Sequence, residues 1–195
     1  MKKLVIYIVS LLSILFSEII KPENGRSLKS IHILFEWDQE ADAVGYNFQI
    51  SNNESFDDII TDITVSTTVH IEKDVLNWDS DYYWRVRPVY INDSFGPWID
   101  EVMFTINPSA LQDFDINLYN EDLIQDGLVI FGQFAPDLMV GVIDKFGNEI
   151  WSNGVLESDH TLGTLLNYVS KQGQLFGKSS ISAVQFNYDE DILWQ

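Results

Sequence analysis

The sequence predicts an all-β protein in which an antiparallel β-sandwich is followed by an incomplete β-propeller of about two blades. Residues that favour strands are abundant, and aromatic residues alone make up 13% of the chain. Short stretches of alternating apolar and polar residues follow one another through the first half. In the second half one hairpin pattern occurs twice, as Leu138–Trp151 and Ile181–Trp194, and its final tryptophans are 43 residues apart.

The repeated hairpin consists of two short apolar stretches joined by a polar turn. In the first copy an apolar run leads to Asp144, Gly147-Asn148 supplies the positive φ of a tight turn, and the second strand ends at Trp151. In the second copy Asn187 stands at the position of Asp144. A period of about 40–45 residues is typical of propeller blades, each of which has four strands.

Composition excludes several classes of partner. The chain has 195 residues, 46% of them hydrophobic, a net charge of −19 and no cysteine. Such an acidic chain repels nucleic acid phosphates and anionic lipids, so neither is expected as a partner. The acidity suits a soluble surface, and the calcium-binding alternative finds no Asp-x-Asp-x-Asp-Gly loop. We therefore expect no metal, no cofactor and no disulfide.

The first residues have the pattern of an export signal. Met1–Ser17 begins with two lysines after the first methionine and continues with the apolar run Leu4–Phe16, which is too short to span a bilayer comfortably. An uncleaved anchor continuing through Ile19-Ile20 is the alternative, but Glu18 interrupts it. The sequence therefore predicts a signal peptide over residues 1–17 and a periplasmic, surface-bound or secreted protein.

Residues 18–27 contain Pro22 and Gly25 and are predicted to be a linker. Residues 28–107 are expected to form the sandwich, because short alternating strands separated by turns are typical of that architecture. Phe56 is expected to plug a loop, and Leu76 and Trp78 to fold under a connection. Strands are expected at Ile31–Trp37, Tyr46–Ile50, Ile59–Ile71 (one strand or two), Tyr82–Tyr90 and Trp98–Ile106.

Residues 108–195 are assigned to the propeller. Gly127–Phe134 is predicted to be a strand, whereas the apolar spacing of His160–Ser170 suits either a helix or a strand. Closing a propeller takes at least four blades of about 40 residues. There is room for only two after Asn107. We therefore expect the start of a longer array, and hence either an N-terminal piece of a larger protein or a truncated gene product.

Part of the chain resembles a known sandwich. The segments that carry the likeness are Phe35-Glu36-Trp37, Gly45–Ser51, Tyr82–Pro88 and Gly96-Pro97-Trp98 with Phe104-Thr105, and together they resemble a fibronectin type III domain of exported bacterial proteins. The resemblance implies that Tyr82 is the tyrosine-corner residue. It also implies spacing, docking or dimerisation rather than chemistry, with a protein or glycan partner or a second copy of the chain.

Arg85 and Arg87 lie on one face of the strand that begins at Tyr82. An anionic ligand on this sheet face is one interpretation. Pairing with neighbouring carboxylates is the interpretation that we favour, since the surface is acidic.

The second half resembles another family. Gly127–Phe131, Val140–Trp151 and Phe186–Trp194 resemble the opening blades of the arylsulfotransferase propeller family. The resemblance implies a parent enzyme that transfers a sulfuryl group from an aryl sulfate to a phenol through a histidine. Similar phrases occur in propellers that bind a quinone cofactor and in non-catalytic scaffold propellers, so a quinone-dependent dehydrogenase and an exported binding or scaffold protein are the alternatives.

The histidines decide what this chain can do by itself. A histidine nucleophile needs cationic side chains to hold the sulfuryl oxygens. His32 and His70 fall in the sandwich, His160 alone falls in the propeller part, and no arginine follows Arg87. His160 is thus the single catalytic candidate, and a loop position is the simpler interpretation. We expect no catalytic residue in this chain and no activity from it alone.

Overall fold

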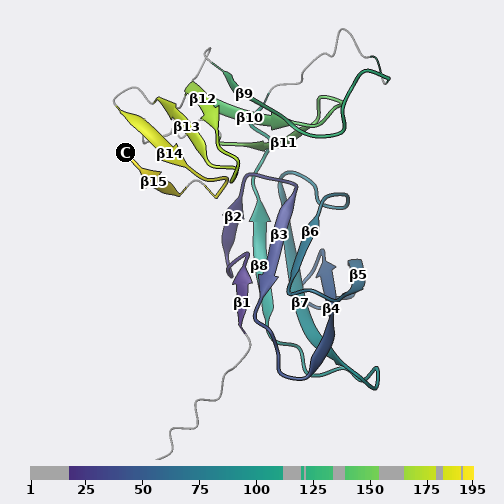
Figure 1. Ribbon diagram of the computed structural model, residues 1–195. Helices are drawn as coiled ribbons and strands as arrows, with labels where there is room; N and C mark the ends of the chain where they lie inside the picture. The colour runs from purple at the N-terminus through teal and green to yellow at the C-terminus, as the bar shows by residue number, and fades with distance from the viewer. Residues whose placement is uncertain are drawn as a thin grey trace, which may run out of the picture.

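The computed structural model describes residues 18–111, 120, 122–133, 139–153, 165–178, 182–189 and 191–195. Within these ranges all regular structure is β-strand, in antiparallel sheets apart from one parallel pair, so the predicted all-β class is confirmed (Figure 1). The described part of the chain contains no helix that could cross a membrane. The predicted signal peptide and His160 lie outside the described residues.

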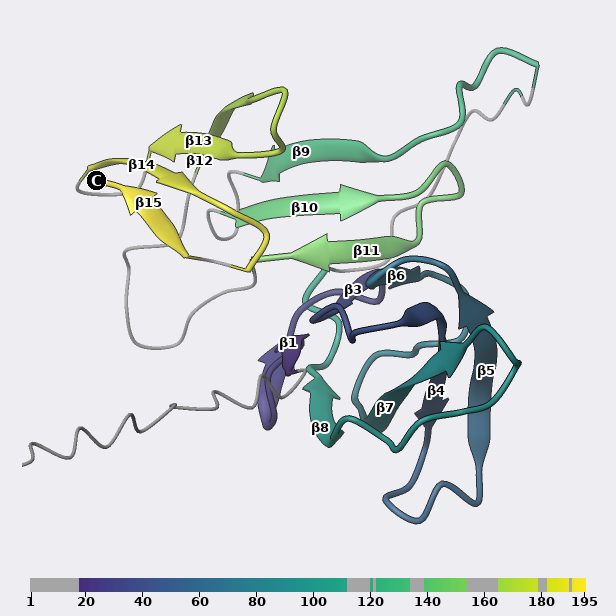
Figure 2. The ribbon, with the colours of Figure 1, turned by 60° about the horizontal axis from the view of Figure 1, so that its bottom comes forward.

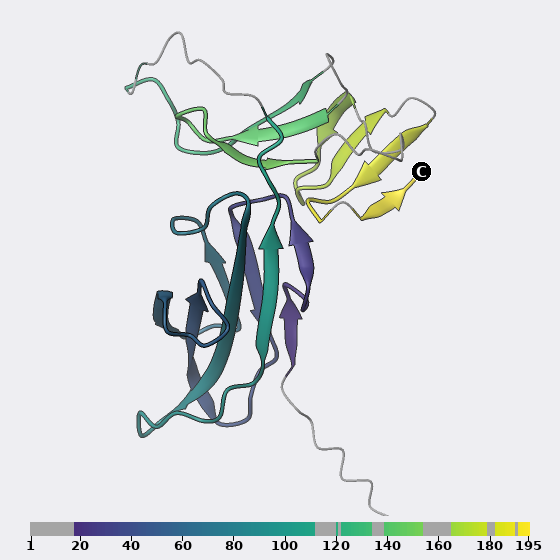
Figure 3. The same ribbon diagram turned by 180° about the vertical axis from the view of Figure 1, so that it is seen from behind.

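The N-terminal unit consists of two sheets that enclose one core, as Figures 1 and 3 show from opposite sides. The smaller sheet has the order β1-β3-β6, with bounds Ile19–Lys21, Ile33–Trp37 and Val69–Glu72. The larger sheet has the order β2-β8-β7-β4-β5, with bounds Arg26–Leu28, Glu101–Ile106, Ser80–Tyr90, Ala43–Ser51 and Ile59–Val65. Residues 59–71 thus supply two strands, one to each sheet.

Alternation along the strands builds an aromatic core. In β3 the residues Ile33, Phe35 and Trp37 are buried while Leu34 between them is exposed. The Phe35 ring meets Phe48, Trp84 and Phe104 edge-on, at centroid distances of 4.9, 5.0 and 5.6 Å. Each such pair contributes about 0.5–1.5 kcal/mol beyond its buried area. Leu76 is buried in this core, Trp78 packs against it, and Phe56 is buried in its loop, as the sequence predicted.

The predicted linker needs correction. Residues 19–21 and 26–28 form β1 and β2, which pair with β3 and β8. Ile19 and Leu28 pack on the sandwich core, and burial of these apolar side chains stabilises the two short strands. Pro22 and Gly25 lie in the connection between the strands, where their preference for a turn is satisfied.

The C-terminal unit contains two further sheets. One has the order β11-β10-β9 and the other the order β12-β13-β14-β15. Figure 2 shows them side by side, beyond one end of the sandwich. The bounds are Val129–Gln133 (β9), Met139–Ile143 (β10), Glu149–Ser152 (β11), Leu165–Val169 (β12), Leu175–Lys178 (β13), Ala183–Phe186 (β14) and Ile192–Trp194 (β15).

The two sheets share a core and meet closely at one point. Val140, Val142 and Trp151 of the first sheet are buried in one cluster with Leu175, Val184 and Phe186 of the second. A Cβ atom on Gly132 in β9 would lie 3.0 Å from the backbone nitrogen of Leu166 in β12. A side chain at this position would fit only tightly, because the two strands approach each other closely. Neither sheet closes on itself.

Both predicted hairpins are present. β10 pairs antiparallel with β11, and β14 pairs antiparallel with β15. Gly147 has the predicted positive φ, at 89°. For His160–Ser170 the strand alternative is correct over residues 165–169, because β12 finds a partner in β13.

Candidate functional site

A short backbone clamp joins the two units. Ser30 forms an antiparallel bridge with Trp151 at the free edge of β11. The Ile31 N–H donates to the Ile150 carbonyl at 3.0 Å, and the Ser152 N–H donates to the Lys29 carbonyl at 3.3 Å. These bonds satisfy polar backbone groups that an unpaired edge strand would leave open. The start of the sandwich therefore continues the first sheet of the C-terminal unit.

A charged contact joins the units at a second point. The Lys21 ammonium donates to a carboxylate oxygen of Asp189 at 2.6 Å, and an Arg26 Nη donates to the Asp189 carbonyl at 3.2 Å. The hydrogen bond to Asp189 raises the pKa of Lys21 above its usual value, against the opposing effect of burial. The pair is only half-buried, so its contribution to stability is modest.

A cavity of 520 Å³ lies between these contacts, and it is the candidate functional site. Its volume is within the range of about 300–1,000 Å³ that is usual for small-molecule sites. Both units contribute to its walls. In Figure 1 the ends of β2 and β3 lie near β11, where the two units approach each other. The sandwich supplies Lys21, Pro22, Glu23, Arg26, Leu28, Lys29, Ser30, His32, Ile33, Leu34 and Ile71, and the C-terminal unit supplies Leu128, Val142, Ile150, Trp151, Asn187, Tyr188, Asp189 and Asp191.

Trp151 and Tyr188 form the aromatic part of the C-terminal wall. The indole N–H of Trp151 donates to the Tyr188 carbonyl at 2.9 Å, and the rings meet edge to face at 5.2 Å. Burial raises the pKa of the Tyr188 hydroxyl, so this residue is a neutral phenol at pH 7. The arrangement presents an uncharged, largely apolar surface to the cavity.

His32 is the one histidine of the described residues that lines the cavity. Burial, followed by the positive charge of Lys73, lowers the pKa of its imidazole, which is therefore mostly neutral at pH 7. His70 instead packs against Phe48 in the sandwich and lies 3.5 Å from a Glu72 oxygen. The two described histidines therefore do not share a site.

The arginines predicted on the sandwich face form a stacked ladder. Arg85 lies between the rings of Phe56 and Trp98, at 3.8 and 4.1 Å from their centroids. Arg87 lies between Trp98 and Phe95, at 4.2 and 3.9 Å. Trp98 is thus shared by both guanidinium groups, which gives two cation–π contacts on one ring.

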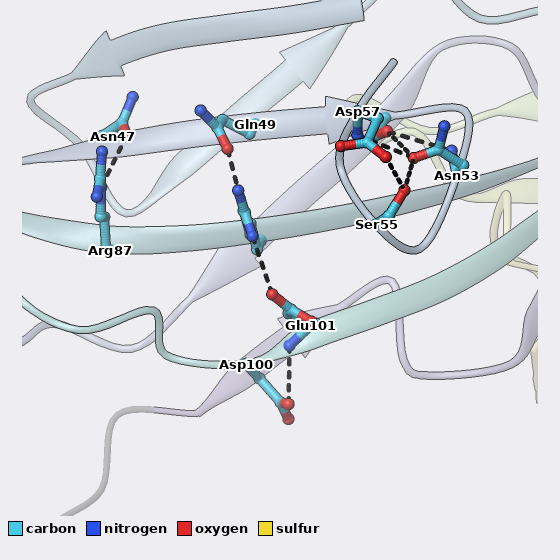
Figure 4. Close-up of polar contacts among 10 residues, drawn as sticks. Asn47, Gln49, Asn53, Ser55, Asp57, Arg87, Asp100 and Glu101 are labelled. Atoms are coloured by element: carbon cyan, nitrogen blue, oxygen red, sulfur yellow. Dashed lines mark hydrogen bonds and ion pairs between the residues drawn. The ribbon is translucent and has the colours of Figure 1, made fainter. Parts of the chain in front are cut away.

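Hydrogen bonds fix the ladder to the sheet, as Figure 4 shows for Arg87 and its neighbours. Arg87 donates to the Asn47 side chain at 2.9 Å. Arg85 donates to Gln49 and to Glu101, each at 3.0 Å. The predicted pairing with a carboxylate is therefore confirmed for Arg85 and wrong for Arg87, because Asn47 occupies the facing position on β4.

Within the described ranges no group of three or more metal-ligating side chains comes together. No protein-family model matches this sequence, and no curated protein matches it. Sequence reasoning missed the cavity, because its walls come from residues far apart in the chain. The one usable signal was exposed apolar residues such as Leu34 on the polar face of a strand.

Proposed function

We propose that this chain is an exported, non-enzymatic binding or scaffold module, in which a fibronectin type III-like sandwich holds two propeller-blade-like sheets. The observation that carries the proposal is the clamp of Lys29–Ile31 on Ile150–Ser152. A sandwich joined by a flexible linker would be free to move, whereas this one continues a sheet of its neighbour. The Met1–Ser17 pattern supports export. A protein or a glycan would bind through the sandwich.

Two features support the kinship of the sandwich with fibronectin type III domains. The Tyr82 hydroxyl accepts a hydrogen bond from the Asn77 N–H at 2.9 Å, a bond of the tyrosine-corner type. The three-stranded and five-stranded sheets pack around one core in the manner of that class of sandwich. Such domains act as spacers and docking units, which agrees with the proposed role.

Two measurements test the module. The whole chain is incubated with p-nitrophenyl sulfate and a phenol acceptor, and we expect no release of p-nitrophenol above the uncatalysed rate. Thermal unfolding of the same chain is expected to give one cooperative transition, because the clamp couples the two units. Ile31→Pro, which removes the N–H that bonds to Ile150, should separate two transitions, while Ile31→Val, which keeps that N–H, should leave one. Turnover, or two transitions in the unchanged chain, would refute the proposal.

A second candidate is that the module belongs to an arylsulfotransferase-like enzyme. It is favoured by the 43-residue correspondence of the two hairpins, whose turns use the same hydrogen bonds at Asp144 and Asn187. Successive sheets that pack on a common core are typical of neighbouring blades. The test is the sequence that encodes a longer form. Further repeats of about 43 residues with histidine and arginine on inner loops would support an enzyme, and their absence would leave the scaffold role.

A further inference from the structure

Three exposed apolar side chains converge on the cavity between the two units. Leu34, Ile71 and Leu128 are 40, 52 and 49% exposed, and all three line it. Leu34 and Ile71 are paired residues of β3 and β6, and Leu128 precedes β9 in the other unit. Apolar surface that is gathered in one concave place, rather than scattered, is typical of a ligand site.

The charges around this cavity balance. The lining contains three cationic side chains, Lys21, Arg26 and Lys29, and three acidic ones, Glu23, Asp189 and Asp191. Of these, Lys21 and Asp189 already form an ion pair at 2.6 Å. An ionic ligand would lose its hydration without finding an excess of opposite charge, so the walls favour an uncharged molecule.

One polar side chain of the lining, that of His32, is free to form further hydrogen bonds within the described part of the chain. Within the described residues the His32 ring makes no hydrogen bond, although its backbone N–H is bound by the Ser30 hydroxyl at 3.1 Å. A neutral imidazole offers one donor and one acceptor. A single hydroxyl or amine on a ligand would satisfy either nitrogen.

We propose that this cavity binds a small, uncharged, mainly apolar molecule that carries one hydroxyl or amine for His32. The apolar part lies against Leu34, Ile71 and Leu128, and the Lys21–Asp189 pair borders the site. The volume of 520 Å³ accommodates a molecule of two or three rings. This binding role goes beyond scaffolding and does not depend on it.

The test uses two dyes that share one skeleton. N-phenyl-1-naphthylamine is uncharged and has one N–H, and 8-anilinonaphthalene-1-sulfonate is the same molecule with a sulfonate. We expect the neutral dye to bind the whole chain saturably, with a rise in fluorescence, and to bind at least tenfold more tightly than the anionic one. Equal or tighter binding of the anionic dye, or no binding of the neutral one, would overturn the proposal.

Substitutions of residues in and near the cavity test whether the neutral dye binds there. Ile71→Trp fills the cavity from an exposed position and should weaken binding of the neutral dye at least tenfold. Val69→Trp is the matched control, because Val69 lies on the same strand, is 43% exposed and does not line the cavity. His32→Phe keeps a ring but removes the hydrogen bond, and should weaken binding about two- to tenfold. Circular dichroism verifies that each variant folds. Equal binding by the two tryptophan variants would refute the location.

Discussion

The indole N–H of Trp151 donates to the Tyr188 carbonyl at 2.9 Å and thereby ties the end of β11 to the turn between β14 and β15. The tie crosses between the two sheets of the C-terminal unit. It also holds the aromatic wall of the cavity in place. Trp194, which is the equivalent residue of the second hairpin, is exposed at the surface instead.

Replacement of Trp151 by Phe should therefore lower the free energy of unfolding by about 1–3 kcal/mol, because the donor is lost and the Tyr188 carbonyl is left without its partner. Urea unfolding monitored by circular dichroism measures this. Trp194→Phe is the matched control and should change stability by less than about 0.5 kcal/mol, since that side chain is 58% exposed. Similar losses in both variants would show that the tie has no special role.

The two hairpin turns have the same hydrogen-bonding arrangement, but the acid and the amide stand in opposite order in the sequence. In the first, Asp144 accepts hydrogen bonds from the Asn148 N–H at 2.9 Å and from its side-chain amide at 2.8 Å. In the second, Asn187 accepts from the Asp191 N–H at 2.9 Å, and its amide donates to the Asp191 carboxylate at 3.0 Å. An acid and an amide thus face each other in both turns, in opposite order.

This exchange predicts how stability should respond when the acid and the amide of the first turn are replaced singly or swapped. Asp144→Asn should destabilise the protein by about 0.5–1 kcal/mol, because two amides then face each other and the bond from Asn148 to a carboxylate is lost. The double variant Asp144→Asn with Asn148→Asp recreates the second turn and should recover most of the loss. Urea unfolding of the two variants decides it. A double variant no more stable than the single one would contradict the equivalence of the turns.

The local sequence pattern was sufficient to predict strands and their buried faces wherever burial follows strand alternation. The face formed by Ile33, Phe35 and Trp37, and both tryptophan-terminated hairpins, follow from side-chain order alone. Pairing between distant segments was not predictable in this way. β1 and β2 are three residues each, and what makes them strands is β3 and β8 rather than their own sequence.

The walls of the cavity and the partners of the arginine ladder likewise could not be predicted from local sequence pattern. Arg87 carries the same charge as Arg85, but the residue that faces it on β4 is Asn47, which only the strand register reveals. Lys21 and Asp189 are 168 residues apart in the chain, and no periodicity connects them. The sequence predicts which faces are buried, and the partners of polar groups follow from the register and the packing of whole units.

The arginine ladder gives a third prediction. Trp98→Ala removes the ring that Arg85 and Arg87 share and should cost about 1–2 kcal/mol, from two cation–π contacts of about 0.5–1 kcal/mol each. In a background that carries Arg87→Lys and Arg85→Lys the same change should cost measurably less, because the stacked guanidinium groups are already gone. Urea unfolding of the four proteins gives the coupling energy. Additive losses would show that the stacking contributes nothing.

The loop of residues 53–57, next to the arginine ladder, holds Phe56 against Arg85. Ser55 Oγ lies 3.0 Å from Asn53 and 2.8 Å from Asp57, and the Asp57 N–H donates to the Asn53 side chain at 3.1 Å (Figure 4). These bonds close the loop around Phe56, which is buried and has a φ of 53°. The ladder therefore extends from the sheet into a hydrogen-bonded loop.

Glu72 makes the stability of the sandwich depend on pH. Its side chain on β6 accepts from Thr61 on β5 at 3.1 Å, and from the N–H groups of Lys73 and Asp74 at 2.9 and 3.0 Å. Burial by itself would raise the pKa of this carboxyl, but the hydrogen bonds outweigh it and lower the pKa below its usual value. Because the two strands belong to different sheets, the ionised group links both halves of the sandwich.

A carboxyl whose pKa is lower in the folded protein stabilises the fold above the unfolded pKa of about 4.3, and the stabilisation is lost as the pH falls through the folded value. We therefore expect the free energy of unfolding to decline below about pH 4.5 in the unchanged protein, and less steeply in Glu72→Gln, which should also be less stable at pH 7. Urea unfolding at pH 7, 5, 4 and 3 measures both effects. Glu54→Gln, at an exposed position, is the control and should keep the slope of the parent. Parallel pH curves for Glu72→Gln and the parent would show that Glu72 does not carry the dependence.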